Sequence, residues 1–274
     1  MKSTASPLEQ RISGRERLSA VLRRGGELVT IDDAAKALRV DRVVAAKTLA
    51  RWNRQGWLKR LRRGLYAPVP LTAASTDQVL DEVWTLVPEL FEPAYVGGAS
   101  AAHHWDLTEQ LFRTTFVYTA RAVRHTEQTI HGMPFSVHHV SKERLFGTRP
   151  LWHGRVKIQV SDPHRTVIDM LADPSVGGGM RHIADCVAAY FRREDADVGR
   201  LIDYARRVGN GAAFKRLGFI GEGAGAPAAL MEACRRYLTK GNAKLDPSIP
   251  SPRLVRRWRL WVPANWTPPP RHDD

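Results

Sequence analysis

The segment over residues 30–67 constrains the fold more than any other part of this 274-residue chain. It predicts two helices, over residues 31–38 and 41–55, with Thr30 and Asp41 as their N-caps. The break between the two helices is only about two residues long. A break this short between a helix of small residues and a basic helix is what a helix-turn-helix requires.

The flanking segments complete a small N-terminal domain. Residues 8–24 predict a preceding helix, and residues 57–60 and 65–67 predict two strands joined by a tight turn over residues 61–64. A basic β-hairpin that directly follows the second helix of a helix-turn-helix is a wing, placed to contact phosphates beside the groove. The sequence therefore predicts a winged helix-turn-helix.

The helix over residues 41–55 separates its side chains by angle, at about 100° per residue. The predicted core arc holds Ala45, Thr48, Leu49 and Trp52. The opposite arc holds Val43, Lys47, Ala50, Arg51 and Arg54. The cations thus lie away from the core, with small residues between them that allow close approach, which is typical of a helix that enters the major groove.

The positive charge is concentrated in the same part of the chain. The sequence has 42 Lys and Arg residues against 28 Asp and Glu residues, for a formal net charge of +14. Residues 1–70 hold 16 of the cations and 6 of the anions. Nine cations lie within residues 39–63, where Asp41 is the one acidic residue; they are Arg39, Arg42, Lys47, Arg51, Arg54, Lys59, Arg60, Arg62 and Arg63. A cluster of one sign points to nucleic acid as the partner.

We predict that these nine residues contact double-stranded DNA. Lys47, Arg51 and Arg54 would lie nearest the base edges or the groove phosphates, and the hairpin cations would contact phosphates. The alternative is a small helical domain with a solvated basic face.

A second domain follows a linker. Residues 67–76 carry two prolines and no charge, which predicts a boundary between domains at residues 1–70 and 76–262. The second domain mixes the two kinds of element, with helices predicted over residues 77–87 and 100–105 and strands over residues 94–96, 114–119, 136–140 and 155–160. From Asp162 to Leu238 the pattern is almost wholly helical, and a returning strand is predicted over residues 254–262. The fold class is therefore α+β. Residues 263–274 are rich in proline and predict a disordered tail.

Three motifs of the second domain could carry chemistry, and each lacks residues that the chemistry needs. The Gly-Gly-x-Ser turn at residues 97–100 could hold a phosphate as in nucleotidyltransferases, but the strand over residues 114–119 has no carboxylate for Mg²⁺. The strand over residues 155–160 offers a lysine without the carboxylates of a nuclease. The ten histidines follow no recognised zinc-ligand spacing. We expect no catalytic residue, metal or cofactor.

Composition also favours a cytoplasmic protein. Cys186 and Cys234 are too few for a disulfide scaffold or a four-cysteine zinc site, and they fit a reducing compartment. Neither a signal peptide nor an apolar run of about 20 residues is recognisable, so we expect no membrane partner.

Four segments in order resemble the AbiEi family, the antitoxins of type IV (abortive infection E) toxin–antitoxin operons. The first is Arg-Gly-Leu-Tyr-Ala-Pro at residues 63–68, and the second is the stretch over residues 95–108 around the glycine turn. The third is the helix start Asp-Pro-x-Arg-Thr-x-x-Asp at residues 162–169, in which Arg165 and Asp169 can pair across one turn. The fourth joins Leu-Asp-Pro-Ser at residues 245–248 to Arg-Trp-Arg-Leu at residues 257–260.

The resemblance implies a bacterial two-domain regulator. Its winged helix would bind inverted repeats in its own promoter and repress the operon, while its C-terminal domain would counteract a nucleotidyltransferase-like toxin of the AbiEii family. Whether the antitoxin contacts the toxin directly is left open by the resemblance. Two alternatives are a stand-alone transcription factor with a sensing domain and a nucleic-acid-modifying enzyme that a winged helix targets.

Overall fold

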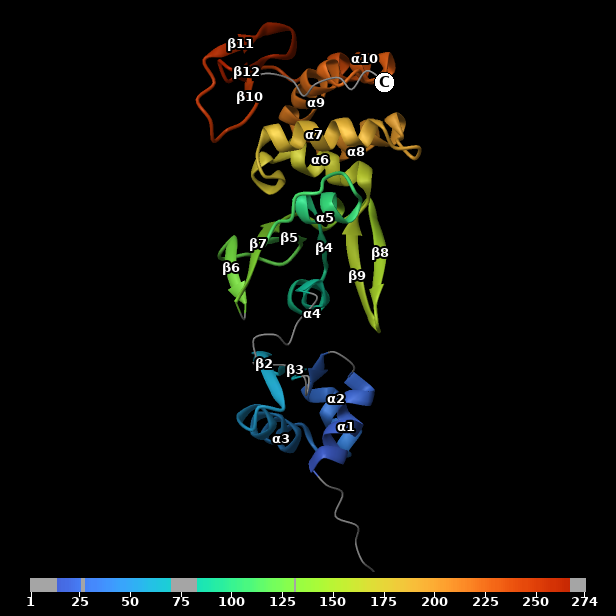
Figure 1. Cartoon of the computed structure of the whole chain (residues 1–274), viewed down its shortest axis with the longest axis vertical. Helices are drawn as coiled ribbons and strands as arrows, with labels where there is room; N and C mark the ends of the chain where they lie inside the picture. The colour runs from blue at the N-terminus through green and yellow to red at the C-terminus, as the bar shows by residue number, and fades with distance from the viewer. Residues whose placement is uncertain (1–13, 26–27, 70–82, 131, 267–274) are drawn as a thin grey trace, which may run out of the picture. The chain divides into compact units, whose positions relative to one another are not determined.

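The chain folds into two compact units, Met1–Glu82 and Val83–Asp274 (Figure 1). The computed structural model describes residues 14–25, 28–69, 83–130 and 132–266. Most of the predicted linker therefore lies outside the described residues, as does the start of the first predicted helix. Each unit is described by itself below.

The N-terminal unit contains the predicted helix-turn-helix. Its helices are α1 (Gly14–Gly25), α2 (Ile31–Leu38) and α3 (Arg42–Arg54). Thr30 caps α2 in a capping box, because its hydroxyl accepts from the Asp33 N–H at 3.1 Å while its own N–H donates to the Asp33 carboxylate at 3.0 Å. The Asp41 carboxylate caps α3 by accepting from the N–H groups of Val43 and Val44 at 2.7 and 2.8 Å. Both predicted N-caps are confirmed.

The N-terminal unit also contains a three-stranded sheet in the order β1-β3-β2. The predicted hairpin is confirmed as β2 (Leu58–Arg62) and β3 (Leu65–Pro68), but its turn is tighter than expected because β2 runs on to residue 62. Gly64 takes the left-handed conformation that this turn needs, with φ +86°. The third strand, β1 (Val29–Thr30), was not predicted, since two residues carry no alternation pattern.

The core of the N-terminal unit confirms the predicted inner face of α3. Ala45, Thr48, Leu49 and Trp52 are all buried. Ala45, Leu49 and Trp52 pack with side chains of the other elements, namely Val21, Val29, Ala34, Leu58 and Tyr66. This packing fixes the rotation of α3 about its axis and turns the opposite face to solvent.

The C-terminal unit contains a mixed sheet of six strands in the order β6-β7-β5-β4-β9-β8. Its strands are β4 (Ala94–Val96), β5 (Thr115–Thr119), β6 (Glu127–Ile130), β7 (Met133–His139), β8 (Thr148–His153) and β9 (Val156–Ser161). The pairs β5–β7 and β4–β9 are parallel, and the other pairs are antiparallel. The edge strands β6 and β8 were missed from the sequence because they are polar or, in β8, contain Pro150.

The helices of this unit are α4 (Leu86–Phe91), α5 (Gly98–His104), α6 (Pro163–Ala172), α7 (Met180–Phe191), α8 (Val198–Val208), α9 (Gly211–Gly223) and α10 (Ala228–Arg236). Helix α4 precedes the sheet in the chain, α5 lies between β4 and β5, and the other helices follow the last strand of the sheet. Figure 1 shows α5 next to the sheet, followed by α6–α8 and then by α9 and α10. The class is α+β, as the sequence predicts.

Three predictions for this unit need correction. The helix expected over residues 77–87 begins outside the described residues, and the described part has a 3-10 turn at Val83–Thr85 followed by α4. The single strand expected over residues 254–262 is a hairpin of β11 (Arg253–Val255) and β12 (Leu260–Val262), to which β10 (Ala243–Lys244) adds in parallel. Arg259, with φ +50°, breaks the strand. Residues 263–266, expected to be disordered, include a buried Pro263 and a Trp266 that packs on the core.

A buried ion pair joins α6 to the sheet. Arg165 Nε donates to Asp169 Oδ1 at 2.8 Å, and these side chains are 1% and 3% exposed. The Tyr95 hydroxyl on β4 accepts from Arg165 Nη2 and donates to Asp169 Oδ2, each at 2.9 Å. Burial raises the pKa of Asp169, an effect that Arg165 opposes. The predicted pairing of these residues across one helical turn is confirmed, but in the core.

We expect Asp169→Ala to destabilise the C-terminal unit by about 3–5 kcal/mol, because it leaves the Arg165 charge buried without its partner. Urea unfolding of the full chain, with hydrogen exchange at the amides of α6, measures the loss. The double variant Arg165→Met with Asp169→Leu removes both charges and should lose less. An equal loss in both variants would contradict this role of the pair.

We expect Asp41→Ala to destabilise the N-terminal unit by about 1 kcal/mol, because two N–H groups at the start of α3 lose their acceptor. In a domain of this size, such a loss lowers Tm by about 4–8 °C. Asp41→Asn keeps a capping oxygen and serves as the matched control. If the two variants lose the same stability in thermal unfolding, the cap does not stabilise α3.

Candidate nucleic-acid interface

The outer face of α3 is exposed along its whole length. Val43, Lys47, Ala50, Arg51 and Arg54 are all exposed, whereas the four residues of the opposite face are buried. The angular separation predicted from the sequence is therefore present in the structure. It places the cations of α3 where a groove of nucleic acid could meet them.

The turn between α2 and α3 is short and defined by hydrogen bonds. Arg39 ends α2 in the left-handed conformation, with φ +53°, and the Val40 N–H donates to the Ala35 carbonyl at 3.1 Å. Asp41 then starts α3. The crossing of the two helices is fixed by this turn and by the buried face of α3.

The hairpin is held to both helices of the motif. The Arg60 N–H donates to the Asn53 side-chain carbonyl at the end of α3, at 2.8 Å. At the other end of the hairpin, the Ile31 N–H at the start of α2 donates to the Gly64 carbonyl at 3.2 Å. The wing therefore has a defined position beside α3.

The structure brings most of the nine predicted contact residues to the surface. Seven are exposed, namely Arg39, Arg42, Lys47, Arg51, Arg54, Arg60 and Arg63. Lys59 is half-buried, and the Arg62 side chain lies outside the described atoms. Arg42 forms an ion pair with Asp32 on α2, so this cation is already partnered within the protein. The sequence could not reveal that pair, because ten residues separate its members.

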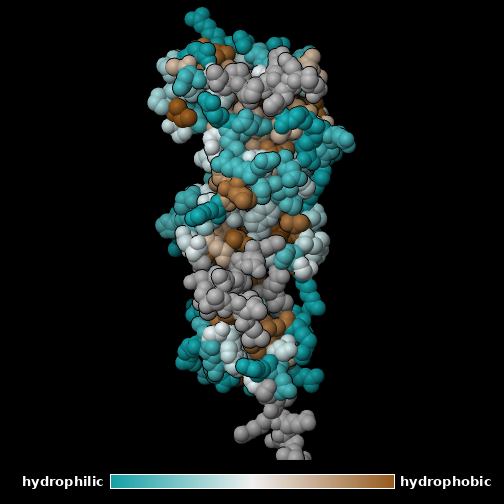
Figure 2. Space-filling model, viewed as in Figure 1, coloured by the Kyte–Doolittle hydropathy of each residue, from teal (hydrophilic) through white to brown (hydrophobic). Residues whose placement is uncertain are grey.

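A second basic surface, which the sequence analysis did not predict, lies in the C-terminal unit. Residues 235–259 contain eight cations, all exposed: Arg235, Arg236, Lys240, Lys244, Arg253, Arg256, Arg257 and Arg259. The one carboxylate in this range, on Asp246, is buried and accepts from the Met180 N–H at 3.1 Å. A count over a short window of sequence would have found this surface, which we call the C-terminal basic surface. On the face shown in Figure 2, hydrophilic residues also cover much of α7 and α8.

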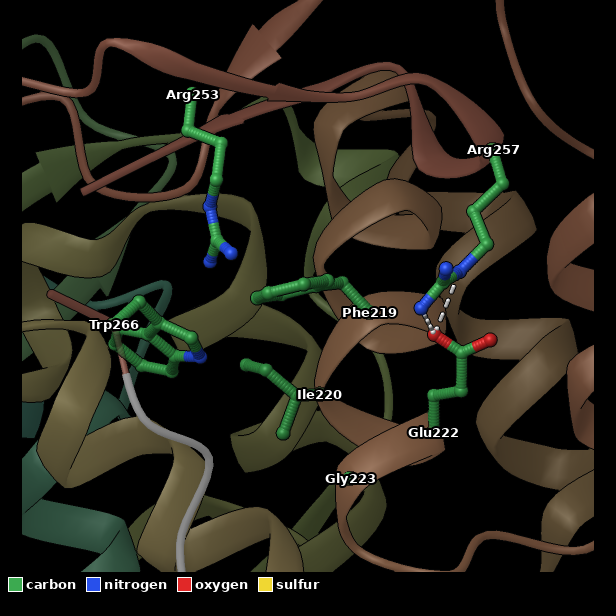
Figure 3. Close-up of a pocket in the computed structure, with 7 residues that line it drawn as sticks. All are labelled: Phe219, Ile220, Glu222, Gly223, Arg253, Arg257 and Trp266. Carbon is green, nitrogen blue, oxygen red and sulfur yellow. Dashed lines mark hydrogen bonds and ion pairs between the residues drawn. The ribbon is translucent and has the colours of Figure 1, made fainter. Parts of the chain in front are cut away.

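A pocket of about 310 Å³ adjoins the C-terminal basic surface (Figure 3). Arg257 donates to the Glu222 carboxylate at 2.7 Å, and Trp258 Nε1 donates to the same oxygen at 3.0 Å. Burial alone would raise the pKa of Glu222, but these hydrogen bonds hold it below its ordinary value. Arg253 points between Phe219 and Trp266. The pocket has the groups to bind an anion, and its one lining carboxylate is already engaged in an ion pair.

The glycine turn that could have held a phosphate is filled by protein. A Cβ atom added at Gly97 would lie 2.8 Å from the Tyr118 ring. One added at Gly98, whose φ is +56°, would lie 2.5 Å from the Val176 carbonyl oxygen. The glycines therefore serve the close passage of the chain from β4 to α5.

The other candidates for chemistry in the described part of the chain give no site. No group of three or more His, Cys, Asp or Glu side chains is arranged to hold a metal among the described residues. Burial raises the pKa of Cys186 and of Cys234 to about 12, so both thiols are protonated. Among the described helices, none has the length and apolar character of a membrane span.

The comparisons with known proteins agree with this geometry. No curated protein matches the chain in sequence. The fold is similar to that in the crystal structure of the RV2827C protein from Mycobacterium tuberculosis, with a TM-score of 0.64 and 18% sequence identity over 92% of each chain. At this identity the likeness is one of fold. Residues 16–69, which span the helix-turn-helix and the wing, match the family model described as "Transcriptional regulator, AbiEi antitoxin". The resemblance predicted from the sequence is thereby confirmed for the N-terminal unit, where residues 16–69 are similar to the AbiEi antitoxin transcriptional regulators.

Proposed function

We propose that this protein is the antitoxin of a type IV toxin–antitoxin system and represses its own promoter. The observation that carries the proposal is the exposed cationic face of α3, which lies in the segment that matches the AbiEi antitoxin regulators. Residues 1–70 form the DNA-binding domain and residues 76–262 the antitoxin domain. This role needs no cofactor, metal or catalytic residue.

In the proposed complex, α3 lies in the major groove of double-stranded DNA. Lys47, Arg51 and Arg54 follow one another along its outer face, at spacings that keep them within reach of the groove. The wing cations, which include Arg60 and Arg63, contact phosphates of the flanking backbone. Inverted repeats in the promoter offer two half-sites, so two copies of the winged helix occupy one operator.

The C-terminal unit carries the antitoxin role in this proposal. The opposed toxin is a nucleotidyltransferase-like protein encoded by a neighbouring gene, as the resemblance to the AbiEi family implies. The unit has its own core, built on α6–α9 and the sheet, and it presents the C-terminal basic surface to solvent. That surface is the first place to introduce charge-reversal variants. Loss of toxin opposition in these variants would support direct contact with the toxin, and unchanged opposition would support an effect without contact at this surface.

A second candidate function is a stand-alone transcription factor whose C-terminal unit senses an anion. The pocket beside Arg253 and Arg257 supports it, because a small anionic ligand could enter there. The genomic neighbourhood separates the two candidates. An adjacent nucleotidyltransferase-like gene supports the antitoxin, and its absence supports the sensor.

We expect the triple variant Lys47→Ala, Arg51→Ala and Arg54→Ala to bind promoter DNA at least about 100-fold more weakly, since each base contact contributes about 1–3 kcal/mol. Gel shifts over a range of salt concentrations measure the affinity. The wild-type affinity should fall steeply with salt, and the slope should be shallower in the variant because fewer counterions are released. The matched control replaces three exposed cations of α1 by alanine, namely Arg15, Arg23 and Arg24. Equal binding by the triple variant and the wild type would contradict the assignment of α3.

We expect the same triple variant, expressed from an unrelated promoter, to rescue growth from the neighbouring toxin as well as the wild type does. The reason is that its C-terminal unit is unchanged. Co-expression in a host that lacks the operon measures the rescue, with immunoblots to equalise protein levels. A segment from residue 76 onward should also rescue growth. If both fail while the full wild-type chain succeeds, toxin opposition requires the DNA-binding face.

A further inference from the structure

We propose that the first turn of α3 reads thymine, through contacts between the Val43 and Val44 methyl groups and the C5-methyl group of the base. The inference rests on the proposed function, since it assumes that α3 enters the major groove. It adds a sequence preference to a surface that was otherwise described only by its charge.

The two valines are unusually exposed for their type. Val43 is 64% exposed and Val44 is 41% exposed. Five large apolar side chains are exposed in the described part of the chain, and these two occupy one helical turn. Folding leaves them in water, so their apolar surface is available to a partner.

The polar neighbours of the two valines are already engaged within the protein. The Asp41 carboxylate accepts from the backbone N–H groups of Val43 and Val44. Arg42 pairs with Asp32 on α2. The hydroxyl of Thr48, one turn further on, is turned back onto the Val44 carbonyl at 2.9 Å. The first turn of α3 therefore offers the valine methyl groups beside Arg42, which is paired with Asp32, and the cations without such an ion pair on α2 begin with Lys47.

One group in the major groove, the methyl group of thymine, is complementary to an exposed apolar surface of this kind. The N-terminal residues of a recognition helix are those that reach the base edges. Each base presents hydrogen-bond donors or acceptors there, and thymine alone adds a methyl group. A valine side chain cannot hydrogen-bond, and its branched Cβ holds one χ1 rotamer in a helix, so its methyl groups are fixed in place. Contact with thymine buries both methyl groups, whereas cytosine at the same position offers a polar amine.

The test begins with a selection of binding sites from random duplex DNA, using the full chain. Each thymine of the selected site is then replaced singly by deoxyuridine, which keeps every hydrogen-bonding group and lacks the methyl group. At one thymine or more in each half-site, the replacement should weaken wild-type binding about fourfold, the value for one buried methyl group. The variants Val43→Ala and Val44→Ala should show a smaller loss at that thymine. Alanine favours the helix, so these variants keep the fold.

Lys47→Ala is the matched control, because it lies on the same face of α3. It should weaken binding to the thymine and deoxyuridine duplexes by the same factor. If no thymine is sensitive in the wild type, or if both valine variants keep the full wild-type loss, thymine reading by this turn is overturned while DNA binding stands. A selection that yields no bound DNA overturns the proposed function itself, and the inference with it.

Discussion

The buried ion pair between Arg165 and Asp169 governs how the C-terminal unit is assembled. Both charged groups are buried there, and the cost of their desolvation is opposed by their mutual attraction and by hydrogen bonds to the Tyr95 hydroxyl. Arg165 also lies 4.2 Å from the centre of the Phe146 ring. Asp162, which caps α6, in turn accepts from the Tyr204 hydroxyl at 2.9 Å. Hydrogen bonds require specific orientations of their donors and acceptors, so these bonds fix the position of α6 relative to β4 and α8. Apolar packing alone would define that position less well.

The N-terminal unit reaches a defined geometry by local means. Thr30 and Asp41 set the starts of two helices, and Trp52 anchors the inner face of α3. The Asn53 side chain then holds the hairpin at the end of the same helix. Thr30, Asp41 and Asn53 each lie within seven positions of the backbone N–H group that they bind. The exposed face of α3 is therefore a consequence of its buried face, since rotating the helix would expose Trp52.

Much of the N-terminal unit could be predicted because its signals are local. Caps, helical period and a basic hairpin all lie within about forty consecutive residues. The C-terminal unit was harder, since its decisive contacts are distant in sequence: Tyr95 and Arg165 meet across seventy positions. The edge strands β6 and β8 lack the apolar alternation that marks a half-buried strand. At the candidate interface, the cations themselves could be predicted from the sequence. The ion pair of Arg42 with Asp32 could not, because it depends on how α2 and α3 cross.

In the complex that we propose, α3 divides affinity from specificity along one helix. Its first turn is apolar at Val43 and Val44, and its later turns carry Lys47, Arg51 and Arg54. Contacts of cations with phosphates strengthen binding to any DNA and weaken with salt, because counterions return to the backbone. Contacts of methyl groups depend on the base and are almost insensitive to salt, since no ion is released. On this helix, raising the salt concentration should therefore weaken general attraction more than it weakens the preference for thymine, so discrimination survives where affinity falls.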